Sequence, residues 1–187
     1  QSFFSLAKAT FQLDFEQWDA LGYWDETYCP YAFEVDNKII ANVSISIATM
    51  IVDGQAYKSV QVGTVMTDPA YQGKGLSRQL MEKVLTDVAN DDIIYLFANK
   101  SVLNFYPKFG FERRTQGTFT IKTKQLQLTP TDIKKVNIYD EKARQLFYET
   151  TVHRMPISTT LGMLQNENIV MFHALTQYTD AIYYVAD

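Results

Sequence analysis

The chain has 187 residues and a formal net charge of −4, with acidic and basic residues mixed along the sequence. Hydrophobic residues make up 47% of it, which is enough for a folded core and excludes a disordered chain. The acidic balance argues against a nucleic-acid partner, since phosphate binding needs a basic surface. No apolar run approaches the ~20 residues that cross a bilayer, and no secretory signal is visible. We therefore expect a cytoplasmic protein without a membrane partner.

Residues suited to metal or thiol chemistry are few. Cys29 is the single cysteine, so no intrachain disulfide forms. Together with His153 and His173 it cannot supply a typical Cys/His zinc site, and we expect no metal. Both histidines lie far from the motifs described below, and we interpret each as structural or exposed. Cys29 has no predicted histidine partner, so we do not expect it to act as a nucleophile.

Hydrophobic periodicity predicts an opening unit of two helical stretches followed by two strands. Residues 2–11 form an amphipathic pattern, and residues 14–28 an aromatic-rich helical or irregular stretch. Strands at 31–35 and 38–47 are joined by Asp36-Asn37, and the second alternates apolar and polar residues. Asp53-Gly54 is a hairpin signal that leads into a further strand at 56–67.

The middle of the chain alternates between helix and strand. A glycine loop opens an amphipathic helix whose stripe runs from Leu76 to Val88. A short apolar run then predicts a buried strand, followed by a short helix before Pro107 and a later strand. These elements are expected at residues 93–98, 101–106 and 118–128 respectively.

The character of the sequence changes after Thr129-Pro130. Helices are predicted at 140–152 and 158–165, and a pair of hairpin strands at 169–175 and 181–185. This order matches that of the first 47 residues, so a degenerate second copy of the opening unit is one hypothesis. We accordingly divide the chain into a domain at 1–128 and a partial α/β domain at 129–187.

The loop at 72–77 has the features of an anion site. It lies where a strand gives way to a helix, whose first N–H groups lack internal partners and whose dipole favours negative charge. Gly73 and Gly75 leave the backbone open to a pyrophosphate, and Lys74 adds a cation. The alternative is a plain glycine turn. The P-loop pattern is absent, and the dinucleotide pattern fails because position 78 is Arg.

Residues 68–77, Asp-Pro-Ala-Tyr-Gln-Gly-Lys-Gly-Leu-Ser, resemble the acyl-CoA loop of the GNAT superfamily. Gln72, Gly75 and Ser77 occupy the fixed places of its Q/R-x-x-G-x-G/A pattern. Ser77 departs from the usual Gly or Ala, and its hydroxyl is small enough to contact a phosphate. The strand before the loop resembles the fourth strand of the family, whose backbone pairs with the pantetheine arm like an added strand.

A second resemblance covers residues 99–111. The family has an Asn after its fifth strand, a Tyr seven residues later and then Gly-Phe, and Asn99, Tyr106 and Gly110-Phe111 match this spacing. In the family the Asn contacts the cofactor arm and the Tyr lies near the thioester sulfur. Tyr106 is otherwise one of 12 tyrosines that core packing would explain. The cofactor-binding residues that the two resemblances imply are Val65, Met66, Thr67, Gln72, Gly73, Lys74, Gly75, Leu76, Ser77 and Asn99.

The resemblance implies an α/β (α+β) fold, with a GNAT-like mixed, mostly antiparallel central sheet flanked by helices. It implies transfer of an acetyl group from acetyl-CoA to a primary amine of a small molecule or peptide by direct attack. The oxyanion donor would be the Met66 N–H, and Tyr106 would protonate the leaving thiolate. A thiol has a reference pKa near ~8.5 and a phenol near ~10, so this transfer is uphill by only about 2 kcal/mol.

The general base, the acceptor and the oligomeric state are not readable from the sequence. Asp25, Glu26 and Glu34 lie where the family shapes its acceptor pocket, but solvated surface carboxylates explain them better. Tyr23, Trp24, Tyr28 and Tyr31 would either line that pocket or pack in the core.

Alternatives to an enzyme remain open at this point. One alternative is a non-catalytic acyl-CoA-binding regulatory module, which fits the departure at Ser77 and the missing base. The other is a structural or interaction protein, in which the glycine loop is only a turn. The family normally opens with a strand before its first helix, so we expect both ends to lie within a longer protein.

Overall fold

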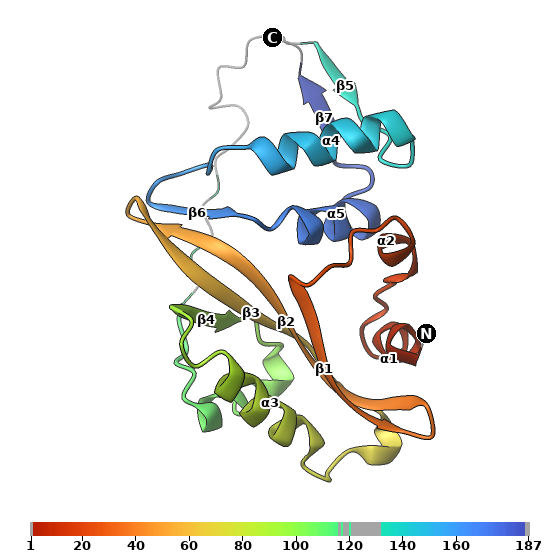
Figure 1. Cartoon of the computed structure of the whole chain (residues 1–187), viewed down its shortest axis with the longest axis vertical. Coiled ribbons are helices and arrows are strands. Elements are labelled where there is room, and N and C mark those ends of the chain that lie inside the picture. The colour runs from red at the N-terminus through yellow and green to blue at the C-terminus, as the bar shows by residue number, and fades with distance from the viewer. Residues whose placement is uncertain (1, 116, 118–119, 121–131, 186–187) are drawn as a thin grey trace.

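The structure is a computed structural model that describes residues 2–115, 117, 120 and 132–185 (Figure 1). Within these described residues, five strands form the main sheet, and a smaller two-stranded sheet lies in the C-terminal part. The first half of the chain has these elements: α1 (Ser2–Phe11), α2 (Glu16–Ala20), β1 (Tyr28–Val35), β2 (Lys38–Val52), β3 (Gln55–Thr67), η1 (Pro69–Tyr71), α3 (Leu76–Asp87) and β4 (Ile93–Leu96). The remainder has these: η2 (Lys100–Val102), η3 (Tyr106–Phe109), β5 (Ile133–Lys135), α4 (Glu141–His153), β6 (Leu161–Leu164), α5 (Glu167–Thr176) and β7 (Tyr183–Val185).

The main sheet is mixed and mostly antiparallel, as expected. Its order is β1-β2-β3-β4, with β6 pairing to β2 outside this path. β1, β2 and β3 are joined by two hairpins, whereas β4 lies parallel to β3 after the crossover through α3. The two hairpin turns are those predicted. Asp36 and Asn37 have φ of +49° and +61°, and Asp53 and Gly54 have +47° and +78°, as in the primed turns that suit a twisted hairpin.

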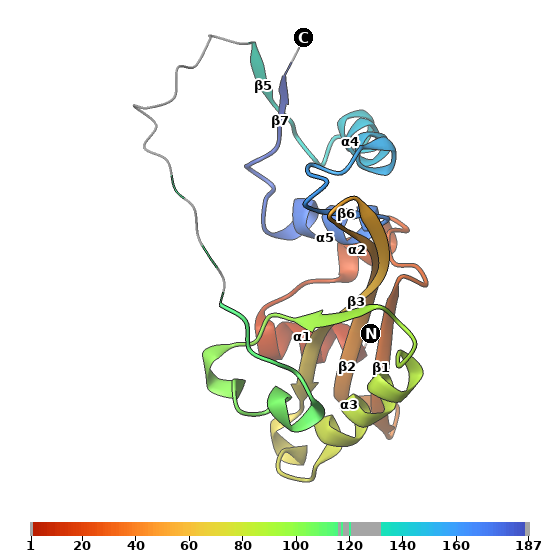
Figure 2. The same cartoon turned by 90° about the vertical axis from the view of Figure 1, so that its left-hand side faces the viewer.

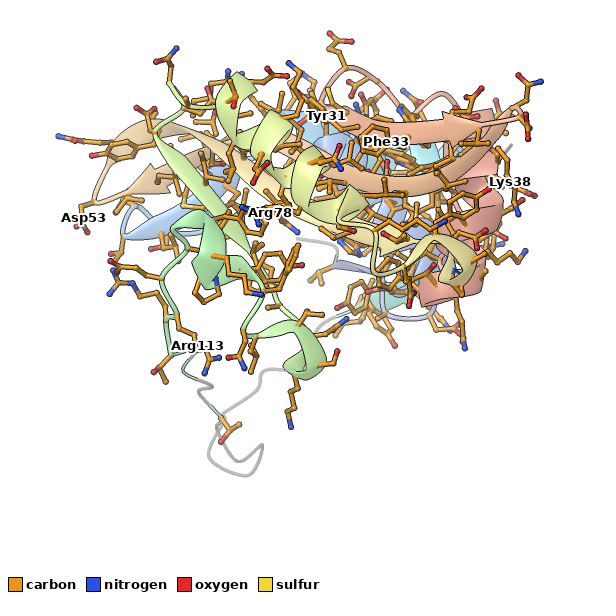
Figure 3. The ribbon with its side chains drawn as sticks, turned by 90° about the horizontal axis from the view of Figure 1, so that it is seen from below. Tyr31, Phe33, Lys38, Asp53, Arg78 and Arg113 are labelled. Atoms are coloured by element: carbon orange, nitrogen blue, oxygen red, sulfur yellow. The ribbon has the colours of Figure 1, made fainter. Side chains whose placement is uncertain are left out.

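Helices cover both faces of this sheet (Figures 1 and 2). On one face, Leu80, Met81 and Val84 of α3 pack on apolar residues of β2 and β3. Tyr31 and Phe33 of β1 lie beside the same helix (Figure 3). On the other face, α1, α2 and α5 build an aromatic core around Phe3, Phe15, Trp18, Tyr28 and Phe172.

The polar side of the alternating strand β2 is buried as well. Asn42 and Ser44 are both 0% exposed and lie on the face opposite to Ala41 and Val43. The Asn42 Nδ2 donates to the Ser44 Oγ at 2.9 Å. Burying polar atoms is costly unless they are hydrogen-bonded. The presence of this pair in the core therefore indicates that it has a specific structural role in the sheet.

The predicted helix at 158–165 is wrong. Leu161–Leu164 is strand β6, whose residues pair antiparallel with Thr49–Val52 of β2. Gly162 allows the chain to pass here, because a Cβ at this position would lie 2.7 Å from the Ser158 carbonyl oxygen. Long-range pairing therefore decides the conformation of a segment whose local pattern is ambiguous.

The predicted hairpin of 169–175 with 181–185 is also wrong. Residues 169–175 lie in helix α5, which buries Met171, Phe172, Ala174 and Leu175. A continuous apolar run fits a buried helix as well as a buried strand, so periodicity could not separate the two. β7 pairs instead with β5. The helix, helix, strand, strand order that motivated a repeated unit is thus not the order observed at 133–185.

The remaining elements agree with the predictions within a few residues. The helix predicted at 140–152 is α4, and the helix predicted at 101–106 is represented by the short turns η2 and η3. The strand predicted at 118–128 lies, apart from residue 120, outside the described residues. Among the residues that the structure describes, no helix is long and apolar enough to cross a membrane.

Candidate functional site

A groove opens where β3 and β4 part. The two strands pair in parallel from Ser59–Ile93 to Val62–Leu96, and β3 then continues to Thr67 while β4 has ended. The residues beyond this point line a cavity of about 760 Å³. That volume lies within the range of small-molecule sites, roughly 300–1,000 Å³. In the part of the chain that the structure describes, the groove thus presents one edge of β3 without a neighbouring strand.

The groove collects nearly all the residues that the two motifs predicted as a site. From the end of β3 and the glycine loop come Val65, Met66, Thr67, Gln72, Gly73, Gly75, Leu76 and Ser77, and from beyond β4 come Asn99 and Tyr106. Lys74 is the exception. Its ammonium lies 4.5 Å from the centroid of the Tyr71 ring, and it is not part of the lining.

The glycine loop has the backbone of an anion cradle. Gly73 and Gly75 have φ of +75° and +76°, in the left-handed region that other residues rarely adopt. A Cβ at either position would meet no atom within 4 Å, so the space above the loop is open. Gly75 is also the residue before α3, and no side chain caps that helix end.

Backbone donors at this helix end are free. Among the described residues, no acceptor is found for the backbone N–H groups of residues 73–78. Gln79 is the first whose N–H is bonded, to the Gly75 carbonyl at 3.1 Å. Unpaired N–H groups at a helix N-terminus, together with its dipole, favour a bound anion.

Side chains fix the loop to the end of β3. The Gln72 Nε2 donates to the Thr67 carbonyl at 3.2 Å, and the Thr67 and Ser77 hydroxyls lie 2.7 Å apart. Ser77 therefore ties the start of α3 to the strand that lines the groove. This bond gives a structural reason for a hydroxyl at the position where the family pattern has Gly or Ala.

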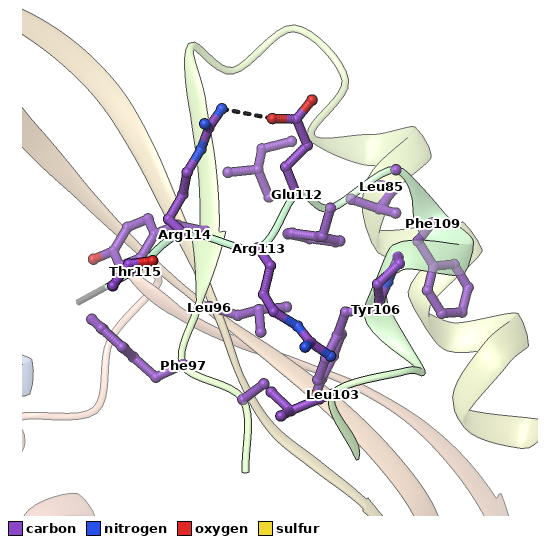
Figure 4. Close-up of a pocket in the computed structure, with 16 residues that line it drawn as sticks. Leu85, Leu96, Phe97, Leu103, Tyr106, Phe109, Glu112, Arg113, Arg114 and Thr115 are labelled. Atoms are coloured by element: carbon purple, nitrogen blue, oxygen red, sulfur yellow. Dashed lines mark hydrogen bonds and ion pairs between the residues drawn. The ribbon is translucent and has the colours of Figure 1, made fainter. Parts of the chain in front are cut away.

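Tyr106 lies in the wall between this groove and a second cavity. The second cavity has a volume of about 790 Å³ and is also lined by Phe97, Leu103 and Phe109 (Figure 4). The Tyr106 ring packs edge-on against Phe105, with centroids 5.2 Å apart. Burial raises the pKa of its phenol, so the group stays protonated at neutral pH. Among the described residues it has no hydrogen-bond partner.

The rim of the second cavity is charged. Arg114 pairs with Glu112 at 2.6 Å (Figure 4), and Arg113 donates weakly to the Asn104 side chain at 3.4 Å. These pairs are exposed, and exposed ion pairs contribute little to stability. The cavity therefore adds no predicted catalytic group besides Tyr106.

A strained bulge in β3 faces the groove. Between the pairs Asn42–Met66 and Ser44–Gly63, two residues of β3 oppose one of β2. One of them, Thr64, has φ of +48°, which is unusual for a β-branched residue. Conformations of this kind cost roughly 1–3 kcal/mol and persist where neighbouring contacts impose them.

Hydrogen bonds from the polar core hold the bulge. The Tyr28 and Thr64 hydroxyls lie 2.6 Å apart, and the Asn42 Nδ2 donates to the Thr64 carbonyl at 2.9 Å. Burial raises the pKa of Tyr28, so it remains a neutral phenol. Sequence reasoning missed the roles of Asn42 and Thr64. The signal available was Asn42, a large amide among the small polar residues of the alternating strand.

The three acidic residues of the region where the family shapes its acceptor pocket are structural or exposed. Asp25 accepts bonds from the Thr27 N–H and hydroxyl and from the Asn168 side chain, so it is a structural carboxylate. Glu26 and Glu34 are exposed. The Cys29 thiol donates to the Glu26 carbonyl, and burial raises its pKa, which is opposite to what an activated nucleophile needs.

Comparison with known proteins identifies the class to which this fold and site belong. Residues 1–114 match the family model described as an acetyltransferase (GNAT) domain. The match covers more than half of the chain, so the chain belongs to the GNAT acetyltransferase family.

Individual relatives agree with this assignment. The chain is 44% identical over 55 residues to the histone acetyltransferase TAP1 of Glycine max, covering 28% of this chain and 24% of that protein. A similar match is 44% identical over 55 residues to GCN5-related N-acetyltransferase 2, chloroplastic, of Arabidopsis thaliana, with 28% and 21% covered. The chain thus spans about a quarter of the length of these curated relatives.

One solved structure resembles almost the entire chain. It is a conserved protein of unknown function from Enterococcus faecalis V583, described as a probable N-acyltransferase. The two share 22% sequence identity and a TM-score of 0.65, over 98% of this chain and 48% of that one. This likeness concerns the fold, and it extends through α4, β6 and α5 as well as the part matched by the family model.

Proposed function

We propose that the protein transfers an acetyl group from acetyl-CoA to a primary amine by direct attack. The observation that carries the proposal is the set of backbone N–H groups at 73–78 that have no acceptor among the described residues. All of these residues except Lys74 line the groove that also contains Tyr106. A diphosphate matches these donors, and an extended pantetheine arm matches the open edge of β3. The groove residues named above would hold the co-substrate.

The chemistry requires three events. The amine must lose a proton, because an alkylamine with a reference pKa near ~10.4 is mostly protonated at neutral pH. The carbonyl oxygen gains negative charge when nitrogen attacks, and a backbone N–H at the open edge of β3 is the proposed donor to it. The Met66 N–H expected for this role points toward β2 instead. The Asp68 N–H donates to the Ile40 carbonyl, and every second antiparallel pair repeats this bonding, which includes Asn42–Met66. The carbon–sulfur bond then breaks, and Tyr106 gives its proton to the departing thiolate.

The raised pKa of Tyr106 suits an acid that must remain protonated until the sulfur leaves. Its pKa also sets a limit. A phenol that is harder to ionise is a weaker acid, so the proton moves to sulfur only as negative charge develops there. Tyr106 is thus proposed as a donor in the transition state and not as a group that ionises beforehand.

Substitution of Gly75 by Asp tests the proposal. A carboxylate at this position would repel a diphosphate held by the 73–78 donors, so we expect acetyl-CoA affinity to fall at least about tenfold in calorimetric titration. Gly54→Asp is the matched control, since Gly54 has the same left-handed φ, +78°, at the hairpin tip far from the groove. Equal affinities of the two variants and the wild type would refute the loop assignment.

Release of free thiol distinguishes acetyl transfer from binding of acetyl-CoA alone. We expect thiol release from acetyl-CoA to depend on an added amine. Tight binding of acetyl-CoA without such release across a panel of amines would instead support the non-catalytic regulatory module.

A further inference from the structure

A third cavity lies on the face of the sheet opposite to α3, between the sheet and α5. It has a volume of about 160 Å³. Its aromatic wall consists of Trp18, Tyr28 and Tyr95, and α5 contributes Ile169 and Val170. Most residues around it are only half-buried, so it borders solvent. Neither motif of the family pattern contributes to this cavity.

The cavity adjoins the groove. Tyr28, which lines the cavity, is hydrogen-bonded at 2.6 Å to Thr64, which lines the groove. Gln61 and Tyr95 of the cavity form the strand pair that directly precedes the last pair, Val62–Leu96, before the strands part. A molecule in the cavity would therefore lie beside the bulge, on the side opposite to α3, with the Tyr28–Thr64 hydrogen bond between it and the groove.

Size and charge restrict what fits. A volume near 160 Å³ is about that of an engineered cavity known to accept benzene, roughly 150 Å³. The described lining contains no Asp, Glu, Lys or Arg. Aliphatic and aromatic side chains dominate, so the cavity favours one apolar group and offers no ion-pair partner to a polycation.

An unsatisfied polar atom also lines this part of the core. Among the described residues, two buried side-chain atoms have no hydrogen-bond partner, the Asn42 Oδ1 and the His173 Nδ1. His173 belongs to the cavity wall. This nitrogen has almost no accessible surface, so it supplies no polar partner inside the cavity.

We propose that this cavity is the acceptor pocket and that it takes a small primary monoamine with a single apolar group about the size of a benzene ring. The inference rests on the proposed acetyl transfer. The apolar group lies against Trp18, Tyr95 and α5, and the amine points toward Tyr28 and Thr64. In the reaction the nitrogen forms a bond to the acyl carbon, and the carbon–sulfur bond breaks. Tyr106 gives its proton to the departing thiolate. The ammonium loses two protons in all, of which one restores the Tyr106 phenol and the other passes to solvent.

Phenethylamine, ethylamine and spermidine serve as probes in the thiol-release assay. For the wild type we expect kcat/KM for phenethylamine to exceed that for ethylamine and for spermidine at least about tenfold, because a pocket that buries a ring discriminates by this order. A wild type that accepts all three amines equally would overturn the pocket assignment and leave acetyl transfer intact.

Val170→Phe fills the cavity. We expect it to raise KM for phenethylamine at least about tenfold and to remove the preference over ethylamine, with the acetyl-CoA Kd within about twofold of wild type. Val152→Phe is the control, because Val152 is exposed on α4. A preference retained in Val170→Phe would refute the assignment.

Ile169→Ala tests the same pocket assignment if the Val170→Phe variant does not fold. It enlarges the cavity, and we expect the preference to shift from phenethylamine toward 2-(1-naphthyl)ethylamine. An unchanged ratio of kcat/KM for these two amines would also refute the assignment. Failure of the proposed function appears differently, as acetyl-CoA binding without thiol release for any amine.

Discussion

At the residue scale, Tyr106 combines two properties that are seldom found together. It is half-buried against aromatic neighbours, which raises the pKa of its phenol, and its hydroxyl has no partner among the described residues. A neutral phenol that is not committed to a structural hydrogen bond is available to a leaving group in the groove. A tyrosine that served only packing would need no hydroxyl, so removal of the oxygen alone is informative.

We therefore expect Tyr106→Phe to lower kcat at least about tenfold while leaving the acetyl-CoA Kd nearly unchanged, because proton donation typically contributes ~10²–10⁴ in rate. Steady-state kinetics and calorimetry measure the two quantities. Tyr57→Phe is a suitable control, since the Tyr57 hydroxyl donates to the exposed Gln55 side chain away from the groove. An unchanged kcat in Tyr106→Phe would remove this residue from the mechanism.

His173 provides a pH-dependent prediction. Burial lowers its pKa, only partly opposed by a hydrogen bond with Gln177. In the unfolded chain the imidazole gains its proton near pH ~6.5, whereas in the folded protein it stays neutral to lower pH. Between these two values the unfolded state binds more protons, so the free energy of unfolding decreases as the pH falls.

Between about pH 7.5 and about pH 5.5, we expect the free energy of unfolding to fall less in the His173→Gln variant than in the wild type. Urea unfolding at each pH measures this difference. His153→Gln, which changes an exposed histidine of α4, should keep the wild-type dependence. The explanation fails if His173→Gln and the wild type lose stability equally over that range.

At the element scale, the bulge of β3 depends on groups from two other strands. Tyr28 begins β1 and Asn42 lies in β2, and both bond to Thr64. The strained φ of Thr64 is therefore stabilised by contacts across the sheet and not by its own sequence neighbours. A bulge held in this way keeps the groove edge in one conformation before any substrate is present.

A double-mutant cycle measures this contact. We expect Tyr28→Phe and Thr64→Val each to lower the free energy of unfolding, and the double variant to lower it by about 1 kcal/mol less than the sum of the two. Urea unfolding at neutral pH measures all four proteins. Additive effects would show that the two hydroxyls do not stabilise one another.

The elements differ in how far the sequence predicts them, for a physical reason. The hairpins, α3 and the glycine loop depend on contacts between close neighbours in the chain, such as the Asp53-Gly54 turn, and local patterns predict them. Strand β6 depends on pairing with β2 more than a hundred residues earlier, and the local pattern does not carry that information. The groove residues were predictable as two motifs, whereas the α5 wall of the proposed acceptor pocket was not.

At the scale of the whole molecule, the C-terminal part shares its core with the N-terminal helices. Phe15 stacks on Phe172 with centroids 4.6 Å apart, and the Trp18 indole donates to the Asn168 carbonyl at 2.7 Å. β6 extends the main sheet as well. One continuous hydrophobic cluster therefore joins the two parts of the chain. The boundary between domains at residue 128 stays a prediction.

We expect this cluster to make unfolding cooperative. Phe172→Ala should lower the free energy of unfolding by about 3–5 kcal/mol, the usual cost of such a cavity. Tryptophan fluorescence, which reports Trp18 and Trp24, should shift together with far-UV circular dichroism in urea. Leu146→Ala on the exposed side of α4 is the control. Two separate transitions would show that the parts unfold independently.

The bond between Trp18 and Asn168 also matters while the protein is being made, because 150 residues separate its two ends. At about 5–20 residues per second, a ribosome needs roughly 8 to 30 seconds to span that interval. Throughout this time the aromatic side chains of α1 and α2 have emerged without the helix that covers them. Hydrophobic surface that is left exposed in this way favours aggregation, and synthesis of α5 ends that exposure.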